Sequence, residues 1–320
     1  MTAFSYGGYS GASRTREVLM AGDLGQRENV LILLIRSLRP RQWIKNLFVF
    51  AGLVFSRNAF EPSLLILSCL AFLLFCLLSG GVYLVNDVLD YDRDRLHPQK
   101  RHRPIASGRL PRRLGAVVGA GLLVVGLAAA SVVGQSFGLV ALGYVALLTV
   151  YSLALKNVVI LDVLIIAVGF VLRAVAGVVV IGVEISSWLL ICTILLALFL
   201  ALGKRRHELL ALPVNPADHR PILSEYTPQL LDQMVAVVTA STVTAYALYT
   251  LSTETVEKFH TRWLPLTIPF VLYGIFRYLY LLYRRELGGN PSELFLTDRP
   301  LLLNLCLWAL AVLAILYFPR

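Results

Sequence analysis

The sequence predicts an all-α integral membrane protein with nine transmembrane helices, because of its composition, its hydropathy and its repeated apolar runs. Of its 320 residues, 58% are hydrophobic and only 15% are charged, whereas soluble domains contain about 45–50% apolar and about 25% charged residues. The mean hydropathy is +0.73. Apolar runs close to the length that crosses a bilayer as a helix, about 20 residues, recur along the chain. This composition excludes a disordered chain, a disulfide scaffold and nearly every soluble enzyme.

The predicted elements begin with a polar segment. Residues 1–28 have no apolar core, so we expect a flexible cytoplasmic tail there and not a signal peptide. The mixed apolar and basic stretch 29–42 is typical of a helix lying at the membrane surface. Residues 29–320 are expected to form one membrane-embedded domain, in which the first span is short unless it continues the surface helix. The nine spans are predicted at residues 43–56, 63–86, 114–133, 137–155, 160–183, 188–203, 230–251, 262–283 and 300–318.

The placement of positive charge predicts the orientation of these spans. Cytoplasmic loops of membrane proteins carry an excess of Lys and Arg. If the N-terminus is cytoplasmic, most of the Lys and Arg residues lie in cytoplasmic loops, which also accounts for the net charge of +10 without a nucleic-acid partner. We therefore expect a protein of the cell membrane whose active site faces the cytoplasm. Only four basic residues would lie on the outer side, counting Arg262 at the outer end of its span: Arg57, Lys258, Arg262 and Arg320.

A group of acidic residues follows the second predicted span, in the sequence YLVNDVLDYDRD. If the helix continues at about 100° per residue, four oxygen-bearing side chains share one quarter of its surface, and Asp92 faces away. Crowded carboxylates repel one another unless a cation lies among them. Oxygen ligands without His or Cys favour Mg²⁺, which often completes its coordination with substrate phosphates. A solvated helix end remains the alternative interpretation. The four candidate metal ligands are Asn86, Asp87, Asp90 and Asp94.

The loop that follows these carboxylates, HPQKRHRPIASGRLPRR, is strongly basic. Carboxylates that bind a metal, followed by cations such as Lys100 and Arg103 that bind anions, suit a magnesium-diphosphate substrate. The segment NDVLDYDRDRLHPQKRHRPIASGRL resembles the first motif of the UbiA superfamily of intramembrane prenyltransferases. The nine predicted spans also match the all-helical architecture of that family. The resemblance implies a UbiA-like bundle and Mg²⁺ as the cofactor.

One departure from the family pattern concerns its second aspartate motif. Asp162 matches the first position of that motif, but Ile166 stands where the second aspartate would fall. This difference weakens the expectation of allylic diphosphate chemistry.

Other stretches resemble one branch of the family, the decaprenyl-phosphate phosphoribosyltransferases. They are RPRQWIKN (39–46), YSLALKNVVILDV (151–163), GFVLRAVAG (169–177) and GKRRHEL (203–209), together with the pattern around Pro291, Glu293 and Asp298–Arg299. The resemblance implies transfer of 5-phosphoribose from 5-phosphoribosyl 1-diphosphate to a polyprenyl phosphate. The donor carries a diphosphate at C1 and a phosphate at C5, so it requires a metal site and a second cationic site.

The resemblance also implies roles for particular residues. Asp87, Asp90 and Asp94 would be catalytic. The substrate-binding residues would be Lys45, Asn86, Lys100, Arg103, Tyr151, Lys156, Asp162, Lys204 and Arg205, with Lys204 and Arg205 as phosphate ligands.

Two other functions remain open. A prenyltransferase with an altered second motif would move a prenyl group to an aromatic or other polar acceptor. A transporter is disfavoured, because transporters carry polar groups near the midplane, whereas the polar cluster here lies at one face. Arg173, deep in the fifth predicted span, is as consistent with a structural role as with a functional one. The sequence does not determine the length of the lipid or whether the chain forms a homo-oligomer.

Overall fold

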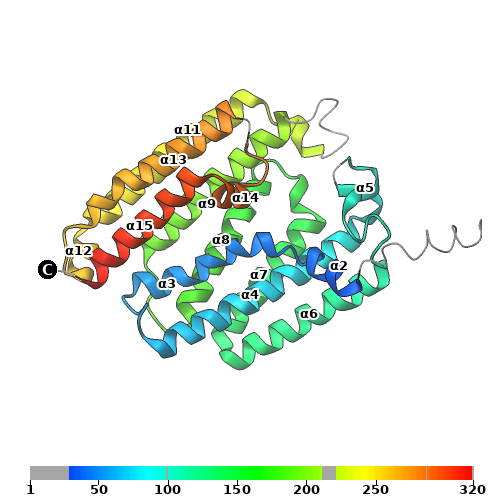
Figure 1. Cartoon of the computed structure of the whole chain (residues 1–320), viewed down its shortest axis with the longest axis horizontal. Coiled ribbons are helices and arrows are strands. Elements are labelled where there is room, and N and C mark those ends of the chain that lie inside the picture. Colours follow the sequence, from blue (N-terminus) through cyan, green and yellow to red (C-terminus); the bar gives the residue numbers. More distant parts are fainter. Residues whose placement is uncertain (1–28, 99, 211–220, 286, 319–320) are drawn as a thin grey trace, which may run out of the picture.

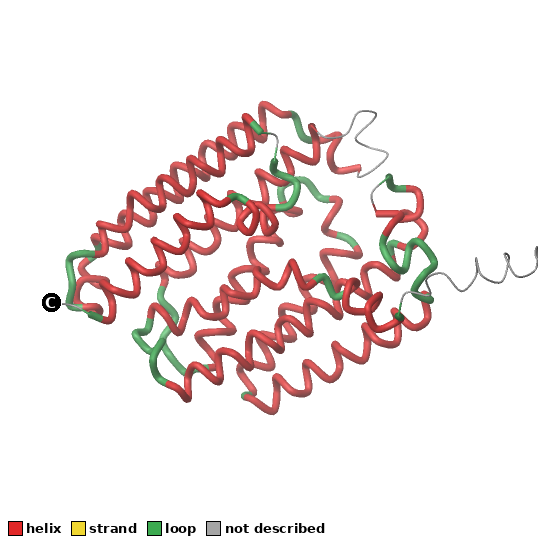
Figure 2. The backbone as a smooth tube through the Cα atoms, in the orientation of Figure 1, coloured by secondary structure: helices red, strands yellow, loops and turns green. Residues whose placement is uncertain are grey.

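The computed structural model describes residues 29–98, 100–210, 221–285 and 287–318. Within these ranges the chain consists of helices and connecting loops and contains no strand (Figure 2). The predicted all-α fold is therefore confirmed for the part of the chain that the structure describes. The tail predicted at residues 1–28 lies outside the described residues.

Eight helices within the described residues are long and apolar enough to cross a membrane. Their most apolar segments have mean hydropathies between 1.4 and 2.7. They correspond to the second through ninth predicted spans. Their bounds are α4 (Pro62–Leu89), α6 (Arg112–Val133), α7 (Gln135–Leu153), α8 (Leu161–Val180), α9 (Ser187–Leu210), α11 (Pro228–Leu251), α13 (Ile268–Arg284) and α15 (Arg299–Tyr317).

The first predicted span, residues 43–56, is not a single long helix, so the count of nine transmembrane helices is not confirmed. This segment is divided between the 3-10 helix η1 (Pro40–Val49) and the short helix α3 (Phe50–Phe55). It follows the helix α2 (Val30–Ser37) after a sharp turn. Hydropathy detects the apolar side chains of this segment but does not distinguish 3-10 from α-helical geometry.

Two features explain the irregular path of the chain here. Arg39 has a positive φ of 55° and is followed by Pro40, so the backbone leaves α2 in a new direction. Further along, η1 packs directly against the backbone of α8, where a Cβ atom added to Gly177 would lie 1.8 Å from the carbonyl oxygen of Val49. Only a glycine permits this close approach of the two segments.

The helices α4 and α8 are the most central of the spanning helices. In the most apolar segment of each of these two helices, 56% is buried inside the protein, compared with 17% in the corresponding segments of α6 and α15. Helix α8 packs against α7, α9, η1 and α3, and α4 packs against α6 and η1. In Figure 1, α2, α3, α4, α6 and α7 lie on one side of α8, and α9, α11, α13 and α15 lie on the other. Helix α8 therefore lies between the two groups.

Several short elements connect the spanning helices at one end of the bundle, which we call the site end. Helix α12 (Thr253–Phe259) and the last turn of α15 lie at the opposite end (Figure 1). Loops that are far apart in the sequence are thereby brought to a common end of the bundle. The short elements of the site end are α5 (Tyr91–Leu96), η2 (Lys100–His102), η3 (Leu155–Asn157), η4 (Pro221–Glu225) and α14 (Pro291–Thr297).

Candidate active site

The predicted carboxylates lie where α4 meets α5 at the site end. The helical hydrogen-bond pattern continues through this junction, because the amide of Asp90 donates to the carbonyl of Asn86 and the amide of Asp94 donates to the carbonyl of Asp90, both at 2.8 Å. Asp90 itself interrupts the helix, with φ of −87° and ψ of 10°, but Asp87 and Asp94 still lie close enough for one guanidinium group to contact both. Asp87 and Asp94 are each 2% exposed, Asn86 and Asp90 are half-buried, and Asp92 is exposed.

Four cationic side chains surround these three carboxylates. They come from the residue before η1, from η2 and the loop after it, and from η3, so the site assembles from three separate segments of the chain. The ion pairs join Asp87 to Arg39 and to Arg103 (3.0 Å), Asp94 to Arg103 (2.6 Å) and to Lys100 (3.9 Å), and Asp90 to Lys156 (3.0 Å).

The contacts of Arg103 bear on whether the residues here suit a magnesium ion. A single guanidinium nitrogen, Nη1, lies 3.0 Å from Asp87 Oδ1 and 2.6 Å from Asp94 Oδ2. One positive group thus contacts two carboxylates at once, as a bound cation would. Among the described residues, no group of three or more His, Cys, Asp or Glu side chains is arranged so that it could hold a metal ion. The two carboxylates that Arg103 contacts nevertheless fit Mg²⁺, which keeps waters or takes substrate phosphates beside a few carboxylates.

Electrostatics around the carboxylates favours the binding of an anion as well. Burial and the nearby charge of Arg103 lower the pKa of Lys100, whereas Asp94 acts in the opposite direction. The guanidinium of Arg39 also stacks over the ring of Tyr83, 4.8 Å from its centroid. Arg39 is not among the site residues predicted from the sequence. Its position at the start of RPRQWIKN was the available signal.

A second charged cluster, formed by Asp162, Arg205, Tyr226, Glu208 and Lys204, lies where α8 begins and α9 ends. Asp162 is fully buried, and its Oδ2 lies 2.8 Å from Nη2 of Arg205, which is 2% exposed. The hydroxyl of Tyr226 donates to Asp162 Oδ1 at 2.7 Å. Arg205 also pairs with Glu208, which in turn lies 3.5 Å from Lys204. This network connects a sealed aspartate to a half-exposed lysine.

Burial keeps the phenol of Tyr226, one member of this second cluster, protonated. Burial and the hydrogen bond to Asp162 raise the pKa of Tyr226 to about 12, so its phenol remains a donor at neutral pH. The same hydroxyl accepts a hydrogen bond at 2.8 Å from the amide of Ile160, which has a positive φ of 68°. Tyr226 therefore holds both the carboxylate and the strained backbone that precedes α8. Nothing in the sequence around Tyr226 indicated this role.

Ile166, which replaces the second aspartate of the family pattern, lies one turn along α8 from Asp162. Its side chain packs against two apolar clusters, one containing Phe199 and the other containing Phe170. No acidic side chain is thus available one turn along α8 from Asp162. The structure places the carboxylate of Asp162 against Arg205 and Tyr226.

The two remaining site residues predicted from the sequence are Lys45 and Tyr151. Lys45 lies on η1, is half-buried and forms no ion pair among the described residues. Its ammonium group is under the influence of the positive charges of Lys204, Arg173 and Arg39. Tyr151 is half-buried near the end of α7. The charge of Lys204 thus acts on Lys45, and neither lysine is among the cations that form the ion pairs of Asp87, Asp90 and Asp94 described above.

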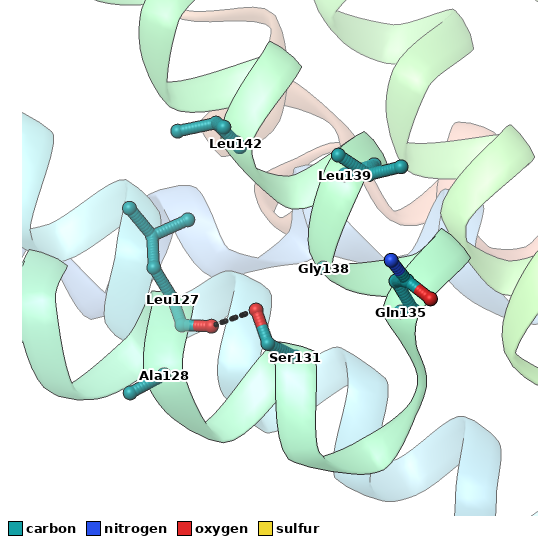
Figure 3. A pocket seen from close by; sticks show the side chains of 7 residues that line it. All are labelled: Leu127, Ala128, Ser131, Gln135, Gly138, Leu139 and Leu142. Carbon is teal, nitrogen blue, oxygen red and sulfur yellow. Dashed lines mark hydrogen bonds between the residues drawn. The ribbon is translucent and has the colours of Figure 1, made fainter.

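A pocket elsewhere on the molecule does not share this character. It lies at the turn between α6 and α7, at the end opposite to the site end, and is lined by residues that include Leu127, Ser131, Gln135 and Leu142 (Figure 3). Its polar groups are few, and the hydroxyl of Ser131 already donates to the carbonyl of Leu127 at 3.0 Å. No ionisable side chain lines it, so it lacks the charges that a phosphorylated substrate requires.

Comparison with known proteins relates the chain to proteins of this architecture. Residues 46–297 match the UbiA prenyltransferase family. The chain is 34% identical over 289 residues to the decaprenyl-phosphate phosphoribosyltransferase of Corynebacterium glutamicum, covering 89% of this chain and 86% of that protein. It is 32% identical over 305 residues to the decaprenyl-phosphate phosphoribosyltransferase of Mycolicibacterium smegmatis, covering 92% and 95%.

Solved structures give a similar result for the fold. A UbiA homolog from Archaeoglobus fulgidus bound to GPP and Mg²⁺ superposes with a TM-score of 0.66 and 20% sequence identity, covering 89% of this chain and 99% of that chain. A structure concerning digeranylgeranylglyceryl phosphate synthase superposes with a TM-score of 0.59 and 15% identity. At these identities the similarity shows a common helical architecture.

Proposed function

Because the chain belongs to the UbiA prenyltransferase family, we propose that it transfers 5-phosphoribose from 5-phosphoribosyl 1-diphosphate to a polyprenyl phosphate of the decaprenyl type, releasing diphosphate. The names of relatives at 32–34% identity over about nine-tenths of the chain support this reaction. The observation that carries the proposal is the division of charge into two parts. Carboxylates with their cations form one part, and Lys45 with Lys204 forms the other, as a donor with a diphosphate at one end and a phosphate at the other requires.

The first part would bind the diphosphate. The ligands of Mg²⁺ would be Asn86, Asp87, Asp90 and Asp94, and the bound ion would neutralise charge on the departing diphosphate. Lys100 and Arg103 would turn from the carboxylates to the diphosphate oxygens, where charge-assisted hydrogen bonds are strong. Lys156, which pairs with Asp90, would keep that carboxylate oriented. Tyr151, near the end of α7, would line the same site.

The second part would bind the 5-phosphate of the donor. The side chain of Lys204 is 44% exposed, and Lys45, which forms no ion pair among the described residues, feels its positive charge, so an anion between the two side chains would be attracted by both. Arg205 is buried against Asp162. We therefore assign Asp162 and Arg205 a supporting role, in which they hold Glu208 and through it Lys204.

The reaction would proceed by displacement at C1 of the ribose. An oxygen of the lipid phosphate forms the new bond to C1 as the bond from C1 to the diphosphate breaks, with inversion and with oxocarbenium character at C1. The lipid phosphate is already anionic at neutral pH, so the nucleophile requires no strong general base. The contribution of the protein is then mainly positioning and electrostatic stabilisation.

The proposed orientation in the cell membrane has a cytoplasmic N-terminus and a cytoplasmic site end. The charge distribution of the loops supports it. Single cysteines replacing the exposed Arg101 and Lys258, in a variant without the four native cysteines, test it with a membrane-impermeant thiol reagent. Cys at position 101 should react only from the cytoplasmic side and Cys at position 258 only from the outside. Labelling of position 101 from outside would contradict the orientation.

The reaction itself is tested with purified protein, a polyprenyl phosphate and 5-phosphoribosyl 1-diphosphate labelled at the 5-phosphate. We expect label in the organic phase after lipid extraction, its loss on chelation of divalent ions and its return on addition of Mg²⁺. Donor labelled in the diphosphate should leave its label in water. If no label enters the lipid, while the protein transfers a prenyl group from a polyprenyl diphosphate to an aromatic acceptor, the prenyltransferase alternative is correct.

A further inference from the structure

Arg173 is a buried charge that the reaction proposed above does not use. It lies in the middle of α8 and is 5% exposed. Among the described residues no carboxylate lies within ion-pairing distance of its guanidinium group. A charge at this depth in a membrane protein is costly unless specific partners compensate it. The partners of Arg173 therefore indicate why this cost is tolerated.

The guanidinium group is held from three directions. Its Nε donates to Oδ1 of Asn46 at 2.8 Å, its Nη1 donates to the carbonyl of Gly169 at 2.8 Å, and its Nη2 donates to the hydroxyl of Tyr144 at 2.6 Å. The rings of Tyr144 and Phe170 also lie against it, with centroids 4.7 and 5.1 Å away. Arg173 thus joins α8 to α7 and, through Asn46, to η1.

Asn46 extends this connection to α4. Its side chain is 1% exposed, and its amide nitrogen lies 3.2 Å from Sγ of Cys76 and 3.3 Å from Oγ of Ser79, both on α4. Asn46 is therefore fixed on both sides, with Arg173 on its oxygen and α4 on its nitrogen. Its side chain therefore connects both central helices of the bundle to η1.

The segment η1 depends on such contacts for its conformation. It spans ten residues, whereas 3-10 helices longer than about four residues are uncommon because their hydrogen-bond geometry is poor. The backbone of Val49 against Gly177 and the bond from Arg173 to Asn46 both hold it to α8. Lys45 immediately precedes Asn46, so any change in the register of η1 moves the Lys45 ammonium away from Lys204.

We propose that Arg173 is a positioning residue, which fixes Asn46 and thereby directs Lys45 toward the 5-phosphate of the donor. This inference rests on the proposed function for the identity of the anion. Geometry and charge can be separated, because lysine keeps the charge of Arg173 but cannot bond in three directions from one rigid plane. If the geometry of the guanidinium group matters, Arg173→Lys should raise the KM for the donor although the positive charge is kept.

The 5-phosphate does not react, so its contacts have the same strength in the ground state and in the transition state. Losing such a contact raises KM and leaves kcat nearly unchanged. We expect Arg173→Lys and Asn46→Ala each to raise the KM for the donor by about tenfold, the effect of one lost hydrogen bond to a charged group. The double variant should be no worse than either single variant, since both act through one bond.

The matched control is Arg277→Lys. Arg277 is also an arginine on a spanning helix, but it bonds to Asp298, through Nε at 3.1 Å and Nη2 at 2.8 Å, and does not contact η1. Its substitution should leave the KM for the donor unchanged. Tyr144→Phe removes the hydrogen bond from Arg173 to Tyr144 but keeps the bond to Asn46. It should therefore raise the KM for the donor less than Asn46→Ala does.

A second measurement does not depend on the substrate. Hydrogen exchange of the segment 40–49, followed by mass spectrometry on the protein alone, should be faster in Arg173→Lys and Asn46→Ala than in the wild type and in Arg277→Lys. Segments of α6 and α11 should be unchanged. This local effect distinguishes positioning of η1 from a general loss of structure.

The inference is overturned if exchange in segment 40–49 and the donor KM both remain at wild-type values in Arg173→Lys. It is equally overturned if exchange rises throughout the bundle, or if kcat falls while KM is kept. If the wild-type protein binds no phosphoribosyl diphosphate, the proposed function fails, and unchanged exchange in segment 40–49 would overturn the positioning of η1 separately.

Discussion

The two central helices each bring aspartate to the site end, but the surroundings of these aspartates differ. The cations that contact Asp87, Asp90 and Asp94 are reached by solvent, since the side chains of Arg39 and Arg103 are each 28% exposed. In the other cluster, Asp162 is fully buried and Arg205 is 2% exposed. The aspartates at the end of α4 thus have arginine partners that solvent reaches, and we call these pairs exchangeable. The pair of Asp162 and Arg205 at the start of α8 is closed to solvent, and we call it sealed.

This difference indicates which carboxylates can bind a metal and a substrate. A carboxylate whose cationic partners face solvent can exchange them for a metal and a substrate. A buried pair cannot exchange without leaving an uncompensated charge, which is strongly destabilising. We therefore expect substitutions of Asp87, Asp90 and Asp94 to reduce turnover, and substitutions of the buried pair Asp162 and Arg205 to reduce stability.

The largest effect should come from the exchangeable carboxylates. Asp87→Ala, Asp90→Ala and Asp94→Ala should each lower kcat by about a thousandfold, because a metal-bound carboxylate stabilises charge in the transition state. Asp92→Ala is the matched control, since Asp92 is exposed and faces away from the site. Turnover is measured by transfer of label into lipid. Equal damage from Asp92→Ala and Asp90→Ala would refute the assignment based on the helical face.

The sealed pair should respond through stability. Arg205→Ala should lower the free energy of unfolding in detergent by about 3–5 kcal/mol, because it leaves the Asp162 carboxylate buried without a cation. Asp162→Ala should lower it less, because Arg205 keeps its ion pair with Glu208. An apolar replacement of both, Asp162→Leu with Arg205→Met, should recover most of this loss. Lys204→Ala should change stability little, since its side chain is 44% exposed. Stability of Arg205→Ala equal to that of the wild type would show that the pair is not sealed.

A smaller effect is expected for Arg103→Ala, which should change the binding of the metal and the binding of the donor in opposite directions. Its Nη1 contacts two of the carboxylates, so it competes with a divalent ion in the absence of donor and assists the diphosphate in its presence. Arg103→Ala should tighten the binding of Mn²⁺ to the protein alone, followed by electron paramagnetic resonance, and weaken the binding of donor. Arg101→Ala, which removes an exposed cation of the same loop, should do neither. Weaker Mn²⁺ binding in Arg103→Ala would mean that Arg103 supports the metal ligands and does not compete with the metal.

Much of the fold followed from patterns that are local in the sequence. Apolar length predicted eight of the spanning helices, and a helical period of about 100° per residue placed Asp92 apart from Asp87 and Asp94. The division of the first span into η1 and α3 was not predictable in this way. It depends on contact with Gly177 and on the turn at Arg39, and neither contributes to hydropathy.

The contacts of the site were only partly predictable, for the same reason. Lys204, Arg205 and Arg206 are adjacent and chemically alike in the sequence, yet Arg205 is the one that turns inward toward Asp162. Arg206 pairs with Asp232 on α11 instead, at 2.6 Å. Which of three neighbouring cations becomes buried is decided by the packing of α8 on α9. The pattern of a single sequence therefore does not predict which of the three side chains is buried.

The central claim, that exchangeable carboxylates and a separate pair of lysines together bind a donor with two phosphorylated ends, is tested most directly by competition. Labelled 5-phosphoribosyl 1-diphosphate bound to detergent-solubilised protein with Mg²⁺ is challenged with ribose 5-phosphate or with geranyl diphosphate. We expect displacement by ribose 5-phosphate, which should disappear in Lys204→Ala, and poor displacement by geranyl diphosphate. Strong displacement by geranyl diphosphate and none by ribose 5-phosphate would contradict the claim and favour prenyl transfer.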